Sequence, residues 1–186
     1  MRKFVAITSF FQKLEQKGSR GLRPLVCFYV LATIAGLGIR SMFAQELRST
    51  EVRLYFMDAD GLKLAVEKRT ITQFDNTIEQ VKLVLTELIR GPMTKLLPTI
   101  PPETGVKEVF IDEKGCAYID FSPALSQNHP GGTTGELATI SSIVNTLATN
   151  FPAEIRKVRI LIGGKEAKTI AGHIDISRPI FPFRLE

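Results

Sequence analysis

The chain has 186 residues, is 44% hydrophobic and 23% charged, and contains no low-complexity tract, which fits one globular domain with an appendage. Its net charge of +5 is unevenly distributed. Residues 1–44 carry seven basic groups and one acidic group, whereas residues 45–186 carry 17 basic and 18 acidic groups. The globular part therefore has no excess positive charge for a phosphate backbone, and the composition argues against nucleic-acid binding.

The N-terminal part of the chain has the pattern of an export segment. A basic stretch, residues 1–23, precedes an uncharged apolar run of 16 residues, 24–39, which Arg40 closes. The run is short for a spanning helix of about 20 residues and long for a signal-peptide core of about 7–15. The basic flank is expected to stay in the cytoplasm. We predict a membrane segment over residues 24–44, which is either an uncleaved signal anchor, the favoured alternative, or a signal peptide cleaved near Ala44.

A linker is predicted at residues 45–51, a globular domain at 52–181 and a tail at 182–186. Alternation of apolar and polar residues predicts strands, and apolar spacing of three or four predicts helices. The expected elements are strands at 52–57 and 64–69, a helix at 77–90, strands at 106–111 and 116–121, a helix within 131–151, and strands at 158–162 and 165–170. This order, ββαββαββ, predicts an α+β fold: a two-layer sandwich whose mainly antiparallel sheet carries both helices on one face.

The second helix has the clearest signals. Gly131 and Gly132 form a tight entry, and Thr133 and Glu136 have the spacing of a capping box. The two glycines could also form an anion-binding nest at a helix N-terminus. Because no P-loop lysine follows them, we interpret them as a helix-entry turn.

The connector after the first helix, residues 93–105, contains three prolines and is predicted to cross the surface in an extended form. Its apolar residues Leu96, Leu97 and Ile100 could dock a partner. Packing onto the domain's own core is the more common arrangement.

The sequence offers few groups for catalysis. Cys116 is the only cysteine of the domain and lies in a predicted strand, so it provides neither an internal disulfide nor a thiolate metal cluster. The two histidines, His129 and His173, are expected in loops. Neither a Cys116–His129 dyad nor a triad of Ser122, His173 and Asp175 has a nucleophile-elbow context. We therefore expect no catalytic site, no cofactor and no metal site.

Several segments, in order, resemble the GerMN domain family, which is named for a sporulation and spore germination protein. They are VRLYFMDADG, the GP that ends the first helix, IPPETGVKEVFIDEKGCAYIDFS, GGTTGEL followed by IVNTL, and VRILIGGKEAKTIAGHIDISRP. The resemblance covers about residues 52–181. It implies an exported domain similar to the ring-building motif of secretion and sporulation channels, with assembly or scaffolding roles and no established catalytic residues.

Two features depart from the sporulation member of that family. The chain has room for one copy of the domain rather than two, and Cys27 lacks the small preceding residues of a lipoprotein site. Both place a spore-specific role in doubt. The motif positions are possible interaction residues or simply fold determinants: Gly131, Gly132, Glu136, Asn145, Gly172, His173 and Asp175.

The leading hypothesis is an exported, membrane-tethered, non-catalytic domain at the cell membrane, on its extracytoplasmic (periplasmic) side. It would bind another envelope protein or itself, with uncovered strand edges as one route. The alternative is a cell-wall glycan-binding module or a peptidoglycan-acting enzyme that uses the loops around Asp120, His129 and His173.

Overall fold

The computed structural model describes residues 48–183 of the chain. The basic N-terminus and the predicted membrane segment, residues 24–44, lie outside the described residues, so both stay predictions. Among residues 48–183, no helix is both long and apolar enough to cross a bilayer.

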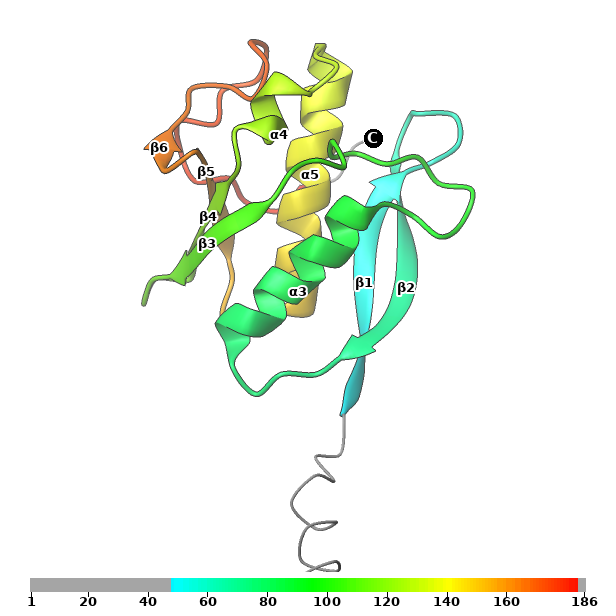
Figure 1. Cartoon of the computed structure of the whole chain (residues 1–186), viewed down its shortest axis with the longest axis vertical. Coiled ribbons are helices and arrows are strands. Elements are labelled where there is room, and N and C mark those ends of the chain that lie inside the picture. Colours follow the sequence, from blue (N-terminus) through cyan, green and yellow to red (C-terminus); the bar gives the residue numbers. More distant parts are fainter. Residues whose placement is uncertain (1–47, 184–186) are drawn as a thin grey trace, which may run out of the picture. The chain divides into compact units, whose positions relative to one another are not determined.

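The elements follow the predicted order, with one short helix added (Figure 1). They are β1 (Ser49–Met57), β2 (Leu64–Thr72), α3 (Thr77–Arg90), β3 (Val106–Ile111), β4 (Cys116–Phe121), α4 (Ala124–Gln127), α5 (Thr133–Asn150), β5 (Lys157–Ile162) and β6 (Lys165–Glu166). The prediction of an α+β fold is confirmed. Strand β1 begins at Ser49, earlier than the predicted domain start at residue 52, and β6 is shorter than predicted.

The strands form two sheets, although we expected the three hairpins to share one. Strands β1 and β2 form a two-stranded sheet, and the other strands form a four-stranded sheet in the order β3-β4-β5-β6. Strand pairing is mainly antiparallel, as predicted, but β4 and β5 pair in parallel. This pairing follows from the connection, because α5 carries the chain back before β5 begins.

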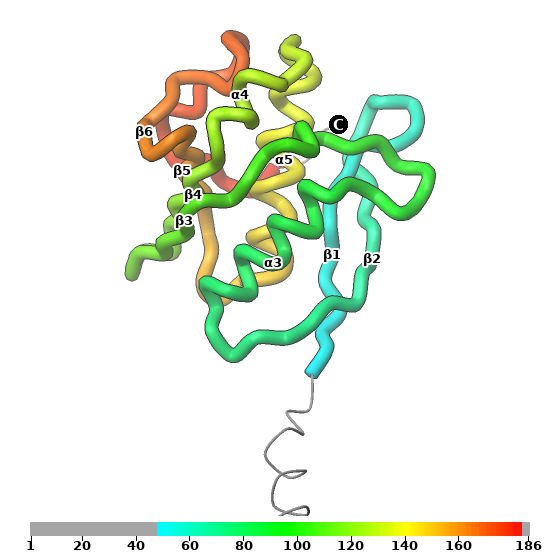
Figure 2. Tube along the Cα trace, viewed as in Figure 1, coloured from blue at the N-terminus to red at the C-terminus, as the bar shows by residue number. Residues whose placement is uncertain are grey.

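The two long helices lie between the hairpin and the four-stranded sheet (Figures 1 and 2). Helix α5 packs against β1 and β5, and helix α3 packs against β1 and β3. Both helices contact the same core, so the hairpin is joined to the larger sheet through the helices. Fully buried large side chains come from every layer: Phe56, Leu85, Phe121, Ile140, Leu147 and Ile160.

Polar side chains of α5 explain why β1 pairs with only one strand. Asn150 Oδ1 accepts from Arg53 N (2.9 Å), and Asn150 Nδ2 donates to Arg53 O (2.7 Å). Tyr55 N donates to Thr146 Oγ1 at 3.1 Å. These are main-chain groups on the side of β1 that faces away from β2. Because α5 occupies them, no strand of the larger sheet can pair there.

The connector between α3 and β3 covers the Met57 end of the same edge. Leu97 N donates to Met57 O (2.8 Å), and Met57 N donates to Leu97 O (3.2 Å). Ile100 is buried, and Leu96 packs against the core. Leu96 and Ile100 therefore take the more common arrangement, packing onto the domain's own core, while Leu97 stays partly exposed.

A buried ion cluster joins β2 to α3 and to the start of the connector. Arg69 bonds to the carboxylate of Glu67 and, at 2.9 Å, to that of Glu87, and it also donates to the main-chain oxygens of Glu87 and Gly91. Glu67 accepts in turn from the main-chain nitrogens of Met93 and Thr94. The cluster thus satisfies the C-terminal end of α3 and fixes the inward face of β2.

We predict that Thr146→Val destabilises the domain although it preserves the shape of the side chain. It leaves the partly buried N–H of Tyr55 without an acceptor, which costs about 1–3 kcal/mol of unfolding free energy. Urea denaturation of the full chain in detergent measures the loss. The matched control is Thr149→Val, whose hydroxyl meets the Tyr55 hydroxyl (3.1 Å). Water can replace that bond, so an equal loss in both variants would contradict the role of α5 as a cover for β1.

Candidate functional site

Glu136, in the first turn of α5, binds the loop that precedes the C-terminal segment. Glu136 is fully buried (0% exposed). Glu136 Oε1 accepts from His173 N (2.9 Å) and His173 Nδ1 (2.8 Å), and Oε2 accepts from Ile174 N (3.1 Å). Burial alone raises the pKa of the Glu136 carboxyl, but these donors outweigh it, so the pKa lies below its ordinary value. The carboxylate is therefore a charged internal clamp.

The predicted capping box at the start of α5 is wrong. The N-cap is Gly132, and no side chain caps this helix end. Glu136 cannot reach back to a capping partner because its carboxylate bonds to residues 173 and 174 instead. Helix α3 by contrast has a side-chain cap, since Asn76 Oδ1 accepts from Ile78 N at 2.8 Å.

Three of the singled-out glycines have backbone conformations that other residues rarely adopt. The φ angle is +81° at Gly131, +81° at Gly132 and +104° at Gly172. A Cβ on Gly131 would lie 4.0 Å from Cε1 of His173, which is ordinary contact. Gly131 thus lies beside His173. We call the group of Gly131, Glu136, Gly172 and His173 the Glu136 cluster.

His129 packs beside this cluster with both ring nitrogens engaged. Its Nδ1 accepts from Gly131 N (2.9 Å), and its Nε2 lies 2.9 Å from Thr139 Oγ1. Burial lowers the pKa of His129, which favours the neutral ring. His129 therefore shapes the glycine turn and presents no free nitrogen in the described contacts.

The two remaining predicted positions share no hydrogen bond with the Glu136 cluster. Asn145 holds Phe183, donating from Nδ2 to Phe183 O (2.7 Å) and accepting from Phe183 N (3.1 Å). Asp175 accepts from Ser177 N at 2.7 Å in a local turn, and hydrogen bonds from Ser177 lower its pKa. Asn145 thus anchors the C-terminal segment, as Glu136 anchors the preceding loop.

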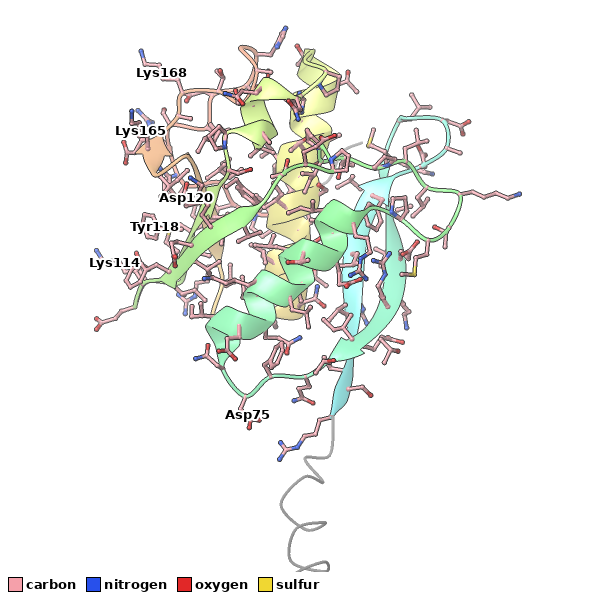
Figure 3. All side chains as sticks on the ribbon, viewed as in Figure 1. Asp75, Lys114, Tyr118, Asp120, Lys165 and Lys168 are labelled. Carbon is pink, nitrogen blue, oxygen red and sulfur yellow. The ribbon has the colours of Figure 1, made fainter. Side chains whose placement is uncertain are left out.

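Among residues 48–183, the candidate catalytic groups are not hydrogen-bonded to one another. The Glu136–His173 pair could orient an imidazole, but no serine, threonine or cysteine among residues 48–183 is hydrogen-bonded to His173. Cys116 is buried, and burial raises the pKa of its thiol, which makes it a poor nucleophile. Asp120, on β4 (Figure 3), accepts from Gly164 N at 2.7 Å and so fixes the turn after β5.

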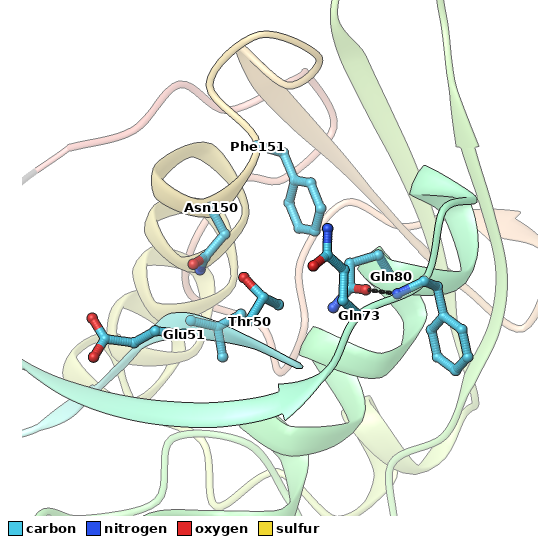
Figure 4. A pocket seen from close by; sticks show the side chains of 8 residues that line it. Thr50, Glu51, Gln73, Gln80, Asn150 and Phe151 are labelled. Carbon is cyan, nitrogen blue, oxygen red and sulfur yellow. Dashed lines mark hydrogen bonds between the residues drawn. The ribbon is translucent and has the colours of Figure 1, made fainter. Parts of the chain in front are cut away.

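Two surface hollows are small for a ligand site. One, of about 140 Å³, lies beside Thr50, Gln73, Gln80 and Asn150 (Figure 4). The other, of about 260 Å³, lies at the turn between β3 and β4. Small-molecule sites are typically about 300–1,000 Å³. In the described part of the chain, no three histidine, cysteine, aspartate or glutamate side chains are grouped to hold a metal.

Sequence reasoning missed the polar residues on the buried side of α5. Thr139, Ser142 and Thr146 are buried, and their hydroxyl groups bond to neighbouring main-chain or side-chain oxygens and nitrogens. The available signal was their position within the apolar stripe, where a polar group needs an internal partner. Glu67 and Arg69 gave a similar signal, because the alternation of β2 places these two charged residues on its buried face.

The fold and the internal clamps define an α+β domain built for a fixed shape. The family model described as "Germane: Sporulation and spore germination" matches residues 53–168, which is more than half of the chain. The chain therefore belongs to this family, and the resemblance to the GerMN domain is confirmed.

Solved structures share the fold. The tandem GerMN domains of the sporulation protein GerM from Bacillus subtilis match with a TM-score of 0.60 and 23% identity over 72% of this chain. The first of these domains alone matches with a TM-score of 0.56 and 23% identity, over 71% of this chain and 97% of its own length. A candidate lipoprotein from Clostridium perfringens matches with a TM-score of 0.52 and 24% identity, over 73% of this chain and 89% of its own length.

This chain spans 46% of the tandem GerM structure, in keeping with a single copy of the domain. No curated protein matches the chain.

We predict that Glu136→Gln destabilises the domain in a pH-dependent way. At neutral pH the amide replaces charge-assisted bonds to His173 and Ile174, at a cost of about 1.5–3 kcal/mol. The folded-state pKa of Glu136 lies below the ordinary value of 4.5, so its ionised form stabilises the fold above that pH. This contribution is lost as the pH falls through the folded pKa. Denaturation at pH 7 and pH 4 measures the difference in unfolding free energy between the variant and wild type, which should be smaller at pH 4. A difference that grows on acidification would contradict the clamp.

We predict that Asn145→Ala releases the C-terminal segment with little change in global stability. Both main-chain groups of Phe183 lose their partner, so its amide should exchange about tenfold faster. Residue-resolved hydrogen exchange of the full chain measures this. The control is Asn128→Ala, whose amide bonds to exposed Glu103. An unchanged exchange rate at Phe183, combined with lost assembly in cells, would make Asn145 an interaction residue instead.

Proposed function

We propose that this chain is an exported, membrane-tethered, non-catalytic domain that binds another protein, or itself, within an assembly of the bacterial cell envelope. The observation that carries the proposal is the different placement of polar and apolar side chains. Glu136, His129 and Asn145 are engaged by groups of the domain itself. The exposed His173 bonds to Glu136 through one ring nitrogen. Several large apolar side chains lie on the surface. A domain of this kind offers shape and apolar surface to a partner.

The apolar surface is found on two parts of the domain. Phe110 on β3 and Phe181 near the C-terminus are each 63% exposed. Phe110 lies next to Tyr118 with ring centroids 6.0 Å apart, and Lys157 lies over the ring of Phe181 at 5.9 Å. The hairpin side of the domain carries exposed Leu62, Val66, Met93 and Leu97. Aromatic and methionine side chains of this kind are enriched at protein interfaces.

The envelope location is supported by two independent observations. The charge pattern of residues 1–44 is that of an export segment whose basic flank stays in the cytoplasm. The similar structures come from a candidate lipoprotein and from a sporulation protein. We propose an uncleaved anchor at residues 24–44, the domain on the extracytoplasmic side, and a partner that is an envelope protein or a second copy.

Chemical cross-linking in intact cells tests the proposal. The full chain, expressed at its natural level, should yield adducts of defined mass with amine-reactive reagents of several spacer lengths. Exposed lysines are available at several sites, and Lys114, Lys165 and Lys168 point outward in Figure 3. Recovery of the monomer alone with every spacer length would contradict the proposal.

The glycan-binding or peptidoglycan-acting alternative gives a different result. Purified full chain in detergent would be incubated with peptidoglycan, with His173→Ala as the matched variant. Turnover that disappears in His173→Ala would replace our proposal with the enzyme, and co-sedimentation without turnover would favour the binding module.

A further inference from the structure

The outer edge of β2 is an uncovered strand edge. In an antiparallel pair, alternate residues turn their main-chain N–H and C=O groups away from the partner strand. Gln73 N bonds to Arg48 O and Lys63 O accepts from Asp58 N, so the odd-numbered residues face β1. Residues 64, 66, 68, 70 and 72 therefore point their main-chain groups outward. Among residues 48–183, only Thr72 O has a partner there, Gln80 Nε2 at 3.2 Å.

Other edges of the two sheets are partly covered, irregular or short, and β6 has only two residues. Helix α5 and the connector occupy the outward main-chain groups of Arg53 and Met57 and the N–H of Tyr55, as described above. Strand β3 is interrupted by a register shift between Val106 and Glu108, and Lys82 Nζ lies 3.4 Å from the main-chain oxygen of Lys107. Strand β2 is nine residues long and has no register shift. It is the longest regular edge that the described structure leaves open.

The usual protections of an exposed edge are weak on β2. Proline, bulges and charged side chains discourage pairing with other chains. Strand β2 contains no proline, and its outward charge, Lys68, is partly neutralised by Glu51 at 2.9 Å. The inward charges Glu67 and Arg69 are held in the buried ion cluster, which fixes the strand in its extended form. The edge is therefore preorganised, which lowers the ordering cost of binding.

Apolar side chains flank this edge. On the solvent-facing side, Val66 is 46% exposed, with Leu64 partly exposed beside it. On the side of the ion cluster, Met93 is 69% exposed, and its N–H bonds to Glu67. A strand added to β2 would place alternate side chains toward each of these surfaces.

We propose that an extended segment of a partner protein adds to β2 as a third strand of this sheet. The segment carries an apolar residue opposite Val66 and a carboxylate opposite Lys68. Main-chain hydrogen bonds to residues 64, 66, 68, 70 and 72 supply affinity, and the side chains beside Val66 and Lys68 select the partner. This inference rests on the proposed function and identifies the surface that performs it.

Charge argues against a second copy of β2 as the occupant. In antiparallel self-pairing, the registers with the greatest overlap are centred on residues 67, 68 or 69. Each of these places Glu67, Lys68 or Arg69 opposite its own copy, and like charges directly opposite are destabilising. The register centred on residue 68 also places Glu67 opposite Arg69, but both side chains are already paired in the buried ion cluster, which leaves the exposed Lys68 opposite its own copy. The partner strand is therefore expected to come from a different chain.

Site-specific photo-cross-linking in cells tests the proposal. A benzophenone amino acid is introduced at Val66, or at Thr70, of the full chain, with Lys114 on the distant β3–β4 turn as the control position. We expect an adduct from positions 66 and 70, at partner residues four apart in one extended run, and none from 114. Thr70→Pro removes an outward N–H that β1 does not use, so it should reduce the Val66 adduct about tenfold. Thr70→Ala, which keeps the N–H, should leave the adduct unchanged.

Several outcomes would overturn the inference. They are an adduct that persists in Thr70→Pro, equal labelling from Lys114, or an adduct of twice the chain mass, which identifies a second copy.

Amide exchange provides a measurement that does not depend on the proline variant. The amides of residues 66, 68 and 70 should exchange rapidly in the purified chain and slowly in the cross-linked complex, and equal rates would reject strand addition. Chemical cross-links without a Val66 adduct reject this surface alone, whereas the absence of both rejects the proposed function as well.

Discussion

The arrangement of this domain depends on one constraint: the main-chain groups that pack against helix α5, most of them partly buried, must find hydrogen-bond partners. The helix provides them from its own side chains. Glu136 binds the main chain at residues 173 and 174, Asn145 binds Phe183, and Thr146 and Asn150 bind β1. An all-apolar helix would leave these groups unsatisfied, at about 1–3 kcal/mol for each one that is buried. Helix α5 therefore works as a connector between layers as well as a core element.

The same constraint determines the division of the strands into two sheets. Because α5 lies along β1 and supplies the bonds that a neighbouring strand would make, the hairpin cannot merge with the four-stranded sheet. The hairpin is then stabilised from one edge by the helix and from its inner face by the ion cluster around Arg69. A buried charge cluster of this type adds little net stability, since desolvation offsets the attraction between the charges. Its effect is to fix the inward side chains of β2 while the outer edge of that strand stays largely unpaired.

Much of the fold could be predicted from the sequence, because hydrophobic periodicity and turn residues are local signals. The order of the elements and the bounds of α3 agree with their patterns. The pairing of the sheets could not be predicted, since Thr146 and Asn150 act on residues about 90 positions earlier in the chain. The capping box at Glu136 failed for the same reason: a distant loop provides better partners than the local turn. The singled-out residues Gly131, Glu136, Gly172 and His173 do lie together, while Asn145 and Asp175 serve other segments.

The inward direction of these polar residues affects where recognition should be sought. Side chains with distinctive chemistry attract attention in a sequence, yet here Glu136, His129 and Asn145 are engaged by the domain's own main chain. Strand addition uses main-chain N–H and C=O groups, which every residue except proline carries in full. A strand edge such as β2 therefore needs no unusual residue to bind a partner. A domain without a catalytic motif can in this way hold a specific binding surface whose position is determined by which edge the fold leaves open.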